Sequence, residues 1–260
     1  MRKSLLAPIV LVAVMLVPAS IGLATASFNQ VATIAVTDHH AGAARVGASV
    51  GLKVNVISTD AGAPGGKPKA AKQIAFAFPA GTRFNLRNSV TKVCTLSDAR
   101  IAKPFGPMCP AASQVGTGTG LLNTMPMGVA LTTIKAPLVA TVRAKAHVYV
   151  HSGGRLIIVL YLNSFDLPGA PPVILHGHAS GHTLTLAVPR LIYGKSKKLK
   201  FNGVPATIVT LKVAIAPTGT GSRALVHAGM CDAGRFRMTS HFTYFDHSGL
   251  AVPSSSRCAG

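Results

Sequence analysis

Residues 143–162 read RAKAHVYVHSGGRLIIVLYL and carry the strongest structural signal in the chain. In the first half, Val148 and Val150 alternate with basic, histidine and tyrosine side chains, as expected of a strand with one face in a core. Ser-Gly-Gly at 152–154 is typical of a hairpin turn. The second half, 156–162, is almost entirely apolar, which predicts a return strand buried on both faces. The stretch therefore predicts an antiparallel hairpin.

The same two-residue period recurs along the chain, at 49–56, 73–78, 183–188, 208–215 and 235–244. Helical periodicity is nearly absent, and the best helix candidate is a short segment at 97–102 with Ser97 in the N-cap position. Many short strands separated by turn residues favour packed antiparallel sheets. We expect an all-β protein, an antiparallel β-sandwich of jelly-roll or immunoglobulin-like type with at most one short helix.

Composition argues against several protein classes. The chain has 260 residues, with 26 Lys and Arg against six Asp and no Glu, and a formal charge of +20. Charged residues make up 12% of the chain, where about 25% is usual. The abundant Val, Ala, Thr, Gly and Pro suit strands and turns. A coiled coil, a helical bundle and an acidic disordered tail are therefore disfavoured, as is any mechanism that requires Glu.

The beginning of the chain has the pattern of a secretory signal peptide. Two basic residues precede an apolar stretch at 5–23, and Ala-Thr-Ala at 24–26 is a small-x-small cleavage site. We expect residues 1–26 to be removed, which leaves 24 basic against six acidic residues, a formal charge of +18. An uncleaved membrane anchor is the alternative, since about 20 residues suffice to span a bilayer. After cleavage we expect no membrane span.

The exported part, 27–260, fits a single large β-sandwich domain. Two smaller β domains divided near 124–128 are the alternative. The Gly- and Pro-rich stretch at 61–69 indicates a surface loop between strands.

Four cysteines in an exported chain indicate two disulfides. Four cysteines allow three connectivities, and we favour the pairing that is local in sequence, Cys94 with Cys109 and Cys231 with Cys258. Both loops are rich in turn residues and would order poorly without a cross-link. A metal site is the rival interpretation, but the chain has no Cys-x-x-Cys pair.

Several pieces of the chain occur in an order that resembles a known family. They include Phe-Pro-Ala-Gly-Thr at 78–82, the pattern Cys-Pro-x-x-Ser-x-Val-Gly-x-Gly at 109–118, and an aromatic strand between the last two cysteines that ends in Tyr-Phe-Asp at 244–246. The chain resembles a family of secreted actinobacterial β-sandwich proteins of unknown function. The resemblance implies a secreted β-sandwich and assigns no activity. Glycines alternate at 116–120, which leaves one strand face bare so that another strand can approach closely.

Three histidines form the strongest candidate for a metal-binding site. His176 and His178 would share one face of a strand, and a turn at 180–181 would bring His182 toward them. Three imidazoles could bind Zn²⁺ or Cu²⁺. The competing interpretation is a hairpin tip with histidines in solvent. We favour it because no carboxylate is near in sequence, the closest being Asp166. We therefore expect no metal and no cofactor.

Other catalytic patterns are weak or absent. The Gly-rich stretch at 116–120 lacks the Gly-Lys-Ser/Thr ending of a phosphate-binding loop. The pattern Gly-x-Ser-x-Gly occurs once, at 47–51, but it leads into the strand expected at 49–56 and lacks the following helix of a nucleophile elbow. Asp232 and Asp246 could form the carboxylate pair of a glycosidase, but their places beside a cysteine and at a turn favour structural roles. We expect no enzymatic activity; an unrecognised hydrolase is an alternative.

The positive charge is the strongest physical signal for function. The densest basic run, and our expected polyanion contact, is Arg190, Lys195, Lys197, Lys198 and Lys200. Arg143 and Lys145 also share a strand face. Such a field favours acidic polymers. Nucleic acid is disfavoured because aromatic residues are only 5% of the chain, with no Trp for base stacking. We expect a secreted or cell-envelope protein that associates with anionic envelope polymers; its oligomeric state stays open.

Overall fold

The structure is a computed structural model, and it describes residues 28–37, 44–60, 67–103, 106–123, 141–163, 166, 170–193 and 204–258. The predicted signal peptide and the alternative domain boundary near 124–128 lie outside the described residues. So do four members of the predicted polyanion contact, Lys195, Lys197, Lys198 and Lys200.

Strands dominate the described residues, as the two-residue period predicts. In chain order they are β1 (Phe28–Thr37), β2 (Gly51–Asp60), β3 (Ala71–Ala77), β4 (Arg83–Phe84), β5 (Gln114–Asn123), β6 (Thr141–His151), β7 (Arg155–Leu162), β8 (Val173–Ser180), β9 (Thr183–Ala187), β10 (Leu191–Tyr193), β11 (Val204–Ile215), β12 (Val226–His227), β13 (Arg235–Tyr244) and β14 (Gly249–Arg257). The helical elements are short: α1 (Asp98–Ile101), η2 (Ala111–Ser113) and η4 (Gly221–Arg223). The predicted all-β antiparallel fold is confirmed, and the part of the chain that the structure describes contains a single short α-helix, where at most one was expected.

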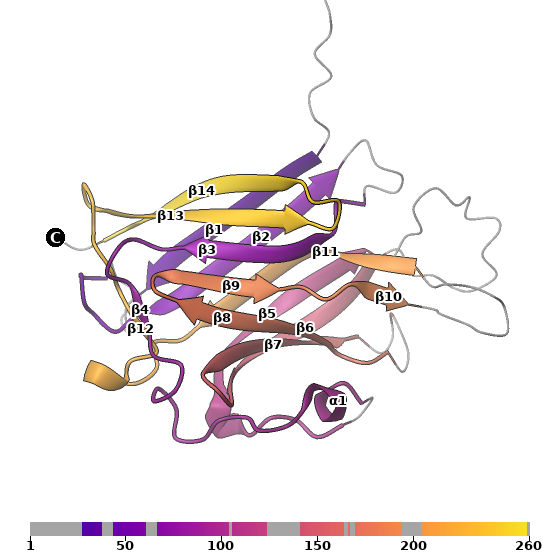
Figure 1. Cartoon of the computed structure of the whole chain (residues 1–260), viewed down its shortest axis with the longest axis horizontal. Coiled ribbons are helices and arrows are strands. Elements are labelled where there is room, and N and C mark those ends of the chain that lie inside the picture. Colours follow the sequence, from indigo (N-terminus) through magenta and orange to yellow (C-terminus); the bar gives the residue numbers. More distant parts are fainter. Residues whose placement is uncertain are drawn as a thin grey trace, which may run out of the picture.

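One large sheet contains most of these strands, in the order β1-β2-β11-β5-β6-β7-β8-β9-β3-β13-β14, with β10 added to β11. A separate small sheet pairs β12 with β4. The large sheet curves until its last strand lies beside its first, where the backbone N–H of Val36 donates to Ser256 Oγ at 3.2 Å. The sheet is therefore nearly closed, and its two halves face each other as layers (Figure 1).

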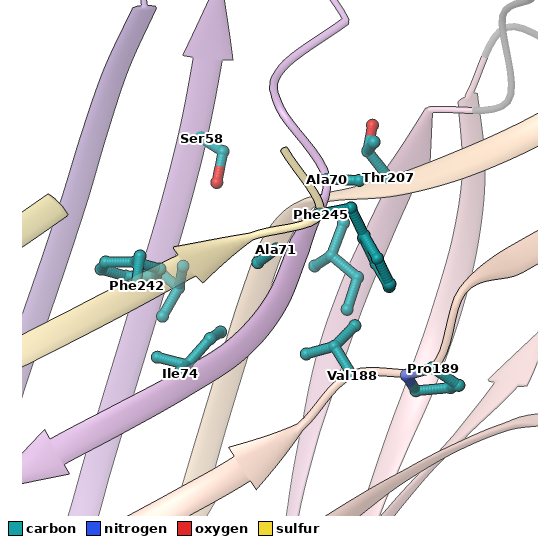
Figure 2. Close-up of a pocket in the computed structure, with 11 residues that line it drawn as sticks. Ser58, Ala70, Ala71, Ile74, Val188, Pro189, Thr207, Phe242 and Phe245 are labelled. Atoms are coloured by element: carbon teal, nitrogen blue, oxygen red, sulfur yellow. The ribbon is translucent and has the colours of Figure 1, made fainter. Parts of the chain in front are cut away.

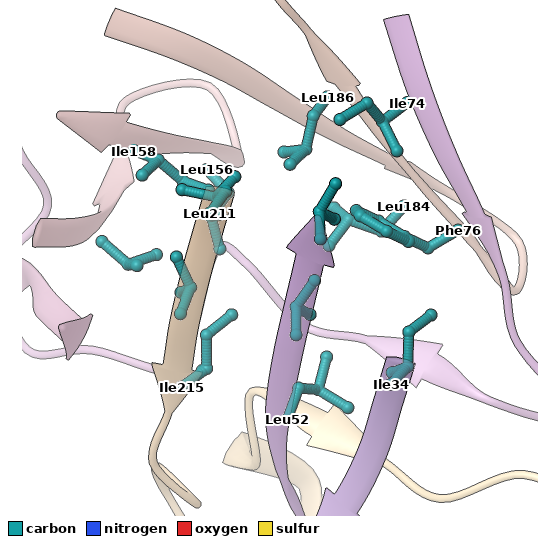
Figure 3. Close-up of a cluster of buried hydrophobic side chains, with 14 of the residues drawn as sticks. Ile34, Leu52, Ile74, Phe76, Leu156, Ile158, Leu184, Leu186, Leu211 and Ile215 are labelled. Carbon is teal, nitrogen blue, oxygen red and sulfur yellow. The ribbon is translucent and has the colours of Figure 1, made fainter. Parts of the chain in front are cut away.

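The main apolar core lies between these two layers. Ile34 of β1, Leu52 of β2 and Leu211 of β11 come from one layer, and Phe76 of β3 and Leu184 of β9 come from the other (Figure 3). Each of the five is at most 4% exposed. Burial of a side chain of this size stabilises the fold by about 1.5–3 kcal/mol. Alternation along each strand then directs the intervening residues outward.

A second, smaller core covers the outside of β6, β7 and β8. Cys94, Ile101 and Cys109, from the segment around α1, pack against Ile157 and Ile174 on the sheet. Residues 156–160 are consequently buried on both faces, as their apolar sequence predicts. The residue before α1 occupies the N-cap position but makes no side-chain capping bond. The helix is therefore held by its buried contacts.

Both predicted disulfides are present. Cys94 bonds to Cys109 with a Cα–Cα distance of 5.2 Å, and Cys231 bonds to Cys258 with 6.3 Å. The first staples the segment over the second core, and the second joins the chain before β13 to the residue after β14. Two disulfides indicate an oxidising environment. A search of the described residues for a helix long and apolar enough to cross a membrane finds none.

The alternating glycines of β5 allow close packing, as their pattern predicts. A Cβ atom on Gly118 would collide with the carbonyl oxygen of Lys212 on β11, and one on Gly116 would collide with that of Ala214. Strand β11 can therefore lie tightly against β5. This contact fixes the positions of the outward side chains on both strands.

Candidate functional site: a basic face of the sheet

The outer face of β2, β11, β5 and β6 carries a row of polar and basic side chains. The residues in direct register across it are Asn55, Lys212, Thr119 and Lys145. Neighbouring strands are about 4.8 Å apart, so Lys212 and Lys145, with one strand between them, stand about 10 Å apart at their backbones. Only the small Thr119 side chain separates them.

The adjacent row on the same face adds a third lysine. It contains Lys53, Ala214, Thr117 and His147 in register. Lys53 is diagonal to Lys212 on the neighbouring strand, a separation of about 7–8 Å. Lys53, Lys145 and Lys212 are all exposed. We call the surface formed by these two rows the basic face.

The three lysines of the basic face have no acidic partner among the described residues. The ion pairs found there join other side chains, including Arg143 with Asp166, whose Nη2 and Oδ1 are 3.0 Å apart. Arg143 lies two residues before Lys145, and its side-chain hydrogen bonds hold the pKa of Asp166 below its usual range. Arg143 is thus paired, while no acidic side chain of the described residues compensates the charge of Lys53, Lys145 and Lys212.

An open hollow of about 630 Å³ lies on the same face. Lys53, Gln114 and Thr117 supply polar groups to it, and small residues such as Gly116 and Ala214 form part of its wall. A side group of an extended polymer can enter the hollow within reach of the Lys53 ammonium group.

His147 ends the second row and is half-buried. Its Nδ1 lies 3.3 Å from Gln114 Oε1 and 3.4 Å from the Tyr149 hydroxyl, and its ring meets Tyr161 edge-on at 5.3 Å. Burial, with a smaller contribution from the charge of Lys145, lowers the pKa of His147. At neutral pH His147 therefore contributes hydrogen bonding, and the lysines contribute the charge.

The predicted polyanion contact differs from the basic face. Of its five residues only Arg190 is described. It follows β9, in the opposite layer, with its guanidinium carbon 6.0 Å from the centre of the Phe245 ring. Sequence inspection missed Lys53 and Lys212, although both occupy outward positions in predicted strands. Lys53 and Lys212 come together only because β2, β11 and β5 are neighbours in the sheet. These strands lie far apart in the sequence, so no local pattern shows this.

The three histidines lie at the predicted hairpin but do not share one site. His176 and His178 are on β8, and His182 is in the turn before β9. Nε2 of His176 is 2.9 Å from Asp98 Oδ2. Asp98 is far from these histidines in the sequence and comes close to His176 only because α1 packs against β8 in the fold. Within the described residues, no group of three His, Cys, Asp or Glu side chains could hold a metal ion.

The two carboxylates considered for glycoside hydrolysis engage different cations. Asp232 pairs with Arg237 at 3.0 Å, and Asp246 pairs with Lys69 at 3.0 Å. Asp246 also accepts a hydrogen bond from the Ser248 hydroxyl, which is the main cause of its lowered pKa. Each carboxylate thus stabilises its own turn.

The basic face has the chemistry of an anion-binding surface. Lysine ammonium groups act as point charges toward phosphate, sulfate or carboxylate, and exposed Thr117 and Thr119 add hydroxyl donors. The surface is open, and its charges repeat along one row, which suits an extended ligand. No family model matches the chain, and no curated protein or solved structure matches it.

Proposed function

We propose that this is an exported, non-enzymatic protein that binds anionic polymers of the cell envelope or extracellular space through its basic face. One observation carries the proposal: Lys212 and Lys145 stand in one row with only Thr119 between them, and neither has an acidic partner among the described residues. Exposed lysines are ordinary one by one, but three that lie close together on one open face raise the local positive potential. With no acidic partner among the described residues, they favour an external anion.

The expected binding is weak and depends on salt. Exposed charges are screened over about 8 Å at 0.15 M ionic strength, which is comparable to the spacing of Lys53, Lys145 and Lys212. Attraction therefore extends to a polymer that lies on the face and falls off quickly beyond it. A polymer with one anionic group per repeat engages several lysines at once, so avidity offsets the weakness of each contact.

Export is part of the proposal. It is supported by the signal-like sequence at 1–26 and by the two disulfides, which form in oxidising compartments. N-terminal sequencing of protein recovered from culture medium or envelope should begin at or near Ser27. An intact Met1 terminus in the membrane fraction would contradict this part and indicate an anchor.

A serine–histidine contact in the structure supports a structural role for both residues. Ser152 Oγ lies 3.1 Å from His151 Nδ1, but Arg155 Nη2 also reaches that nitrogen at 3.3 Å. The Arg155 guanidinium donates to this nitrogen, so the nitrogen that faces Ser152 already accepts a hydrogen bond from another side chain. Nε2 of His151 lies 2.9 Å from the Leu96 carbonyl oxygen. His151 thereby anchors the disulfide segment over the second core.

Dextran sulfate and unmodified dextran test the proposal as a matched pair of polymers. We expect dextran sulfate to bind at low salt, and its affinity to fall steeply as salt rises toward 0.15 M. Unmodified dextran should not bind. Equal binding of the two polymers, or binding of dextran sulfate that does not respond to salt, would contradict an electrostatic contact.

A further inference from the structure

A second concavity of about 630 Å³ lies over the small β4–β12 sheet and contains no residue of the basic face. The segment that begins with β12 lies between the chain around Gly47 and the chain around Ala80. The N–H of Gly47 donates to the Ala228 carbonyl at 2.8 Å on one side, and the N–H of Met230 donates to the Ala80 carbonyl at 2.8 Å on the other. Because these backbones are paired, the concavity has a fixed floor.

Two exposed apolar side chains border this cleft. Met230 is 61% exposed and Val46 is 58% exposed, the two largest values among the large apolar side chains of the described residues. Phe84 also lines the cleft and is held edge-on against Phe78 at 5.3 Å. Single exposed apolar residues are ordinary, but their gathering around one concavity indicates a binding site.

Two nitrogen-bearing side chains face each other on the same small sheet. Arg83 of β4 is directly opposite His227 of β12 in the register, so the two side chains lie on one face. Nδ1 of His227 lies 3.4 Å from the Gly47 carbonyl oxygen, which leaves Nε2 available. The Arg83 guanidinium makes no hydrogen bond or ion pair with any described residue. None of the described residues that line the cleft is acidic.

We propose that this cleft binds a long-chain carboxylate, with its head group between Arg83 and His227 and its chain along Val46 and Met230. A guanidinium matches a carboxylate through two parallel hydrogen bonds, and a methionine side chain adapts readily to an alkyl chain. The volume lies in the range of about 300–1,000 Å³ that is usual for small-molecule sites. The site takes one small amphiphile and is independent of polymer binding.

Dodecanoate, kept below its micelle concentration, is a direct probe, and dodecyltrimethylammonium has the same chain with the opposite charge. Titration calorimetry with the full exported chain should show one saturable dodecanoate site and no site for the cation. Acetate should bind too weakly to detect, because it lacks the chain. No saturable dodecanoate binding, or equal binding of the two amphiphiles, would overturn the proposal.

Variants at each end of the cleft separate the contribution of the carboxylate head group to the affinity from that of the alkyl chain. Arg83→Gln should weaken dodecanoate about tenfold or more, the effect of losing a hydrogen bond to a charged group. Met230→Ser should also weaken dodecanoate binding, because the alkyl chain loses an apolar contact. Acetate binding should remain too weak to detect. Lys72→Gln, an equal charge change at an exposed position outside the cleft, should leave the affinity unchanged. All three positions are exposed, so melting temperatures verify folding, and folded variants with unaltered affinity would refute the site.

Discussion

Asp98 of α1 holds His176 of β8: its Oδ2 lies 2.9 Å from Nε2 of the imidazole. The contact ties the disulfide-linked segment to the outer side of the sheet. It also gives the first residue of the predicted histidine cluster a structural partner. His178 and His182 remain exposed, so the three imidazoles differ in their surroundings and do not converge on one point.

This arrangement predicts the response of the histidines to metal and mutation. Zn²⁺ titrated into the purified protein without an affinity tag should show no one-to-one site. Because the side chains of His176 and Asp98 are 34% and 54% exposed, Asp98→Asn should lower the free energy of unfolding by less than about 1 kcal/mol. Tight stoichiometric Zn²⁺, lost together with stability when all three histidines become Asn, would reverse this interpretation.

The glycines of β5 give a sharp test of the packing. Gly118→Ala should destabilise the protein by about 2–3 kcal/mol, because the new methyl group meets the Lys212 carbonyl oxygen and the strands must separate. Gly120→Ala is the matched control, since its Cβ would lie at an ordinary 3.6 Å from Leu160. Urea denaturation measures both. Equal effects of the two substitutions would show that β11 does not approach β5 as described.

The first disulfide should contribute measurably to stability. Replacing Cys94 and Cys109 together by Ala should lower the free energy of unfolding by about 3 kcal/mol, because the sequence separation of 15 gives a loop that the unfolded chain must otherwise close. Non-reducing peptide mapping of the wild type should yield the two described pairs. A crosslink between Cys94 and Cys231 would contradict the structure.

Stability should change with pH in two opposite directions. Lys67 is 2% exposed, and burial lowers the pKa of its ammonium group to about 8, whereas an unfolded lysine holds its proton to about pH 10.4. The unfolded state therefore binds more protons between these values, and the free energy of unfolding should rise with pH. Burial raises the pKa of Tyr244 to about 12, so stability should fall again above about pH 10, where unfolded tyrosines ionise.

Urea denaturation from pH 7 to 11 measures how the free energy of unfolding changes with pH. Lys67→Met should abolish its increase between about pH 8 and 10 and leave its decrease above about pH 10. A wild-type stability that is flat between about pH 8 and 10 would show that the Lys67 ammonium group is not desolvated in the folded state.

Much of the fold follows from local patterns. Alternation at 49–56 predicted a strand because successive side chains in a strand point to opposite faces. The apolar run at 156–162 predicted a strand that is buried on both faces. The turn at 152–154 predicted the hairpin partner of β6. The cysteine pairs could be predicted because each closes a short loop. These signals depend only on neighbours in the sequence.

The basic face could not be predicted in the same way. Lys53, Lys145 and Lys212 come from strands that are distant in the chain, and their proximity results from the order β2-β11-β5-β6. This order forms only in the folded chain, where β11 pairs with β2 on one side and with β5 on the other. The contact of Asp98 with His176 was missed for the same reason, since α1 reaches β8 only in the folded chain.

If the basic face, and not overall charge, binds anionic polymers, loss of its lysines should weaken binding more than loss of lysines elsewhere. The variant Lys53→Gln, Lys145→Gln, Lys212→Gln removes three charges from the face. The control variant Lys72→Gln, Lys92→Gln, Lys103→Gln removes three exposed charges elsewhere. The two therefore have the same net charge.

The decisive measurement is the affinity of wild type and of both variants for dextran sulfate at low salt. We expect the variant in the basic face to bind about tenfold more weakly or worse, with a shallower dependence on salt, because three of its direct charge contacts are gone. The control should stay close to wild type. Equal loss in both variants would show that net charge alone drives the association and would contradict the account.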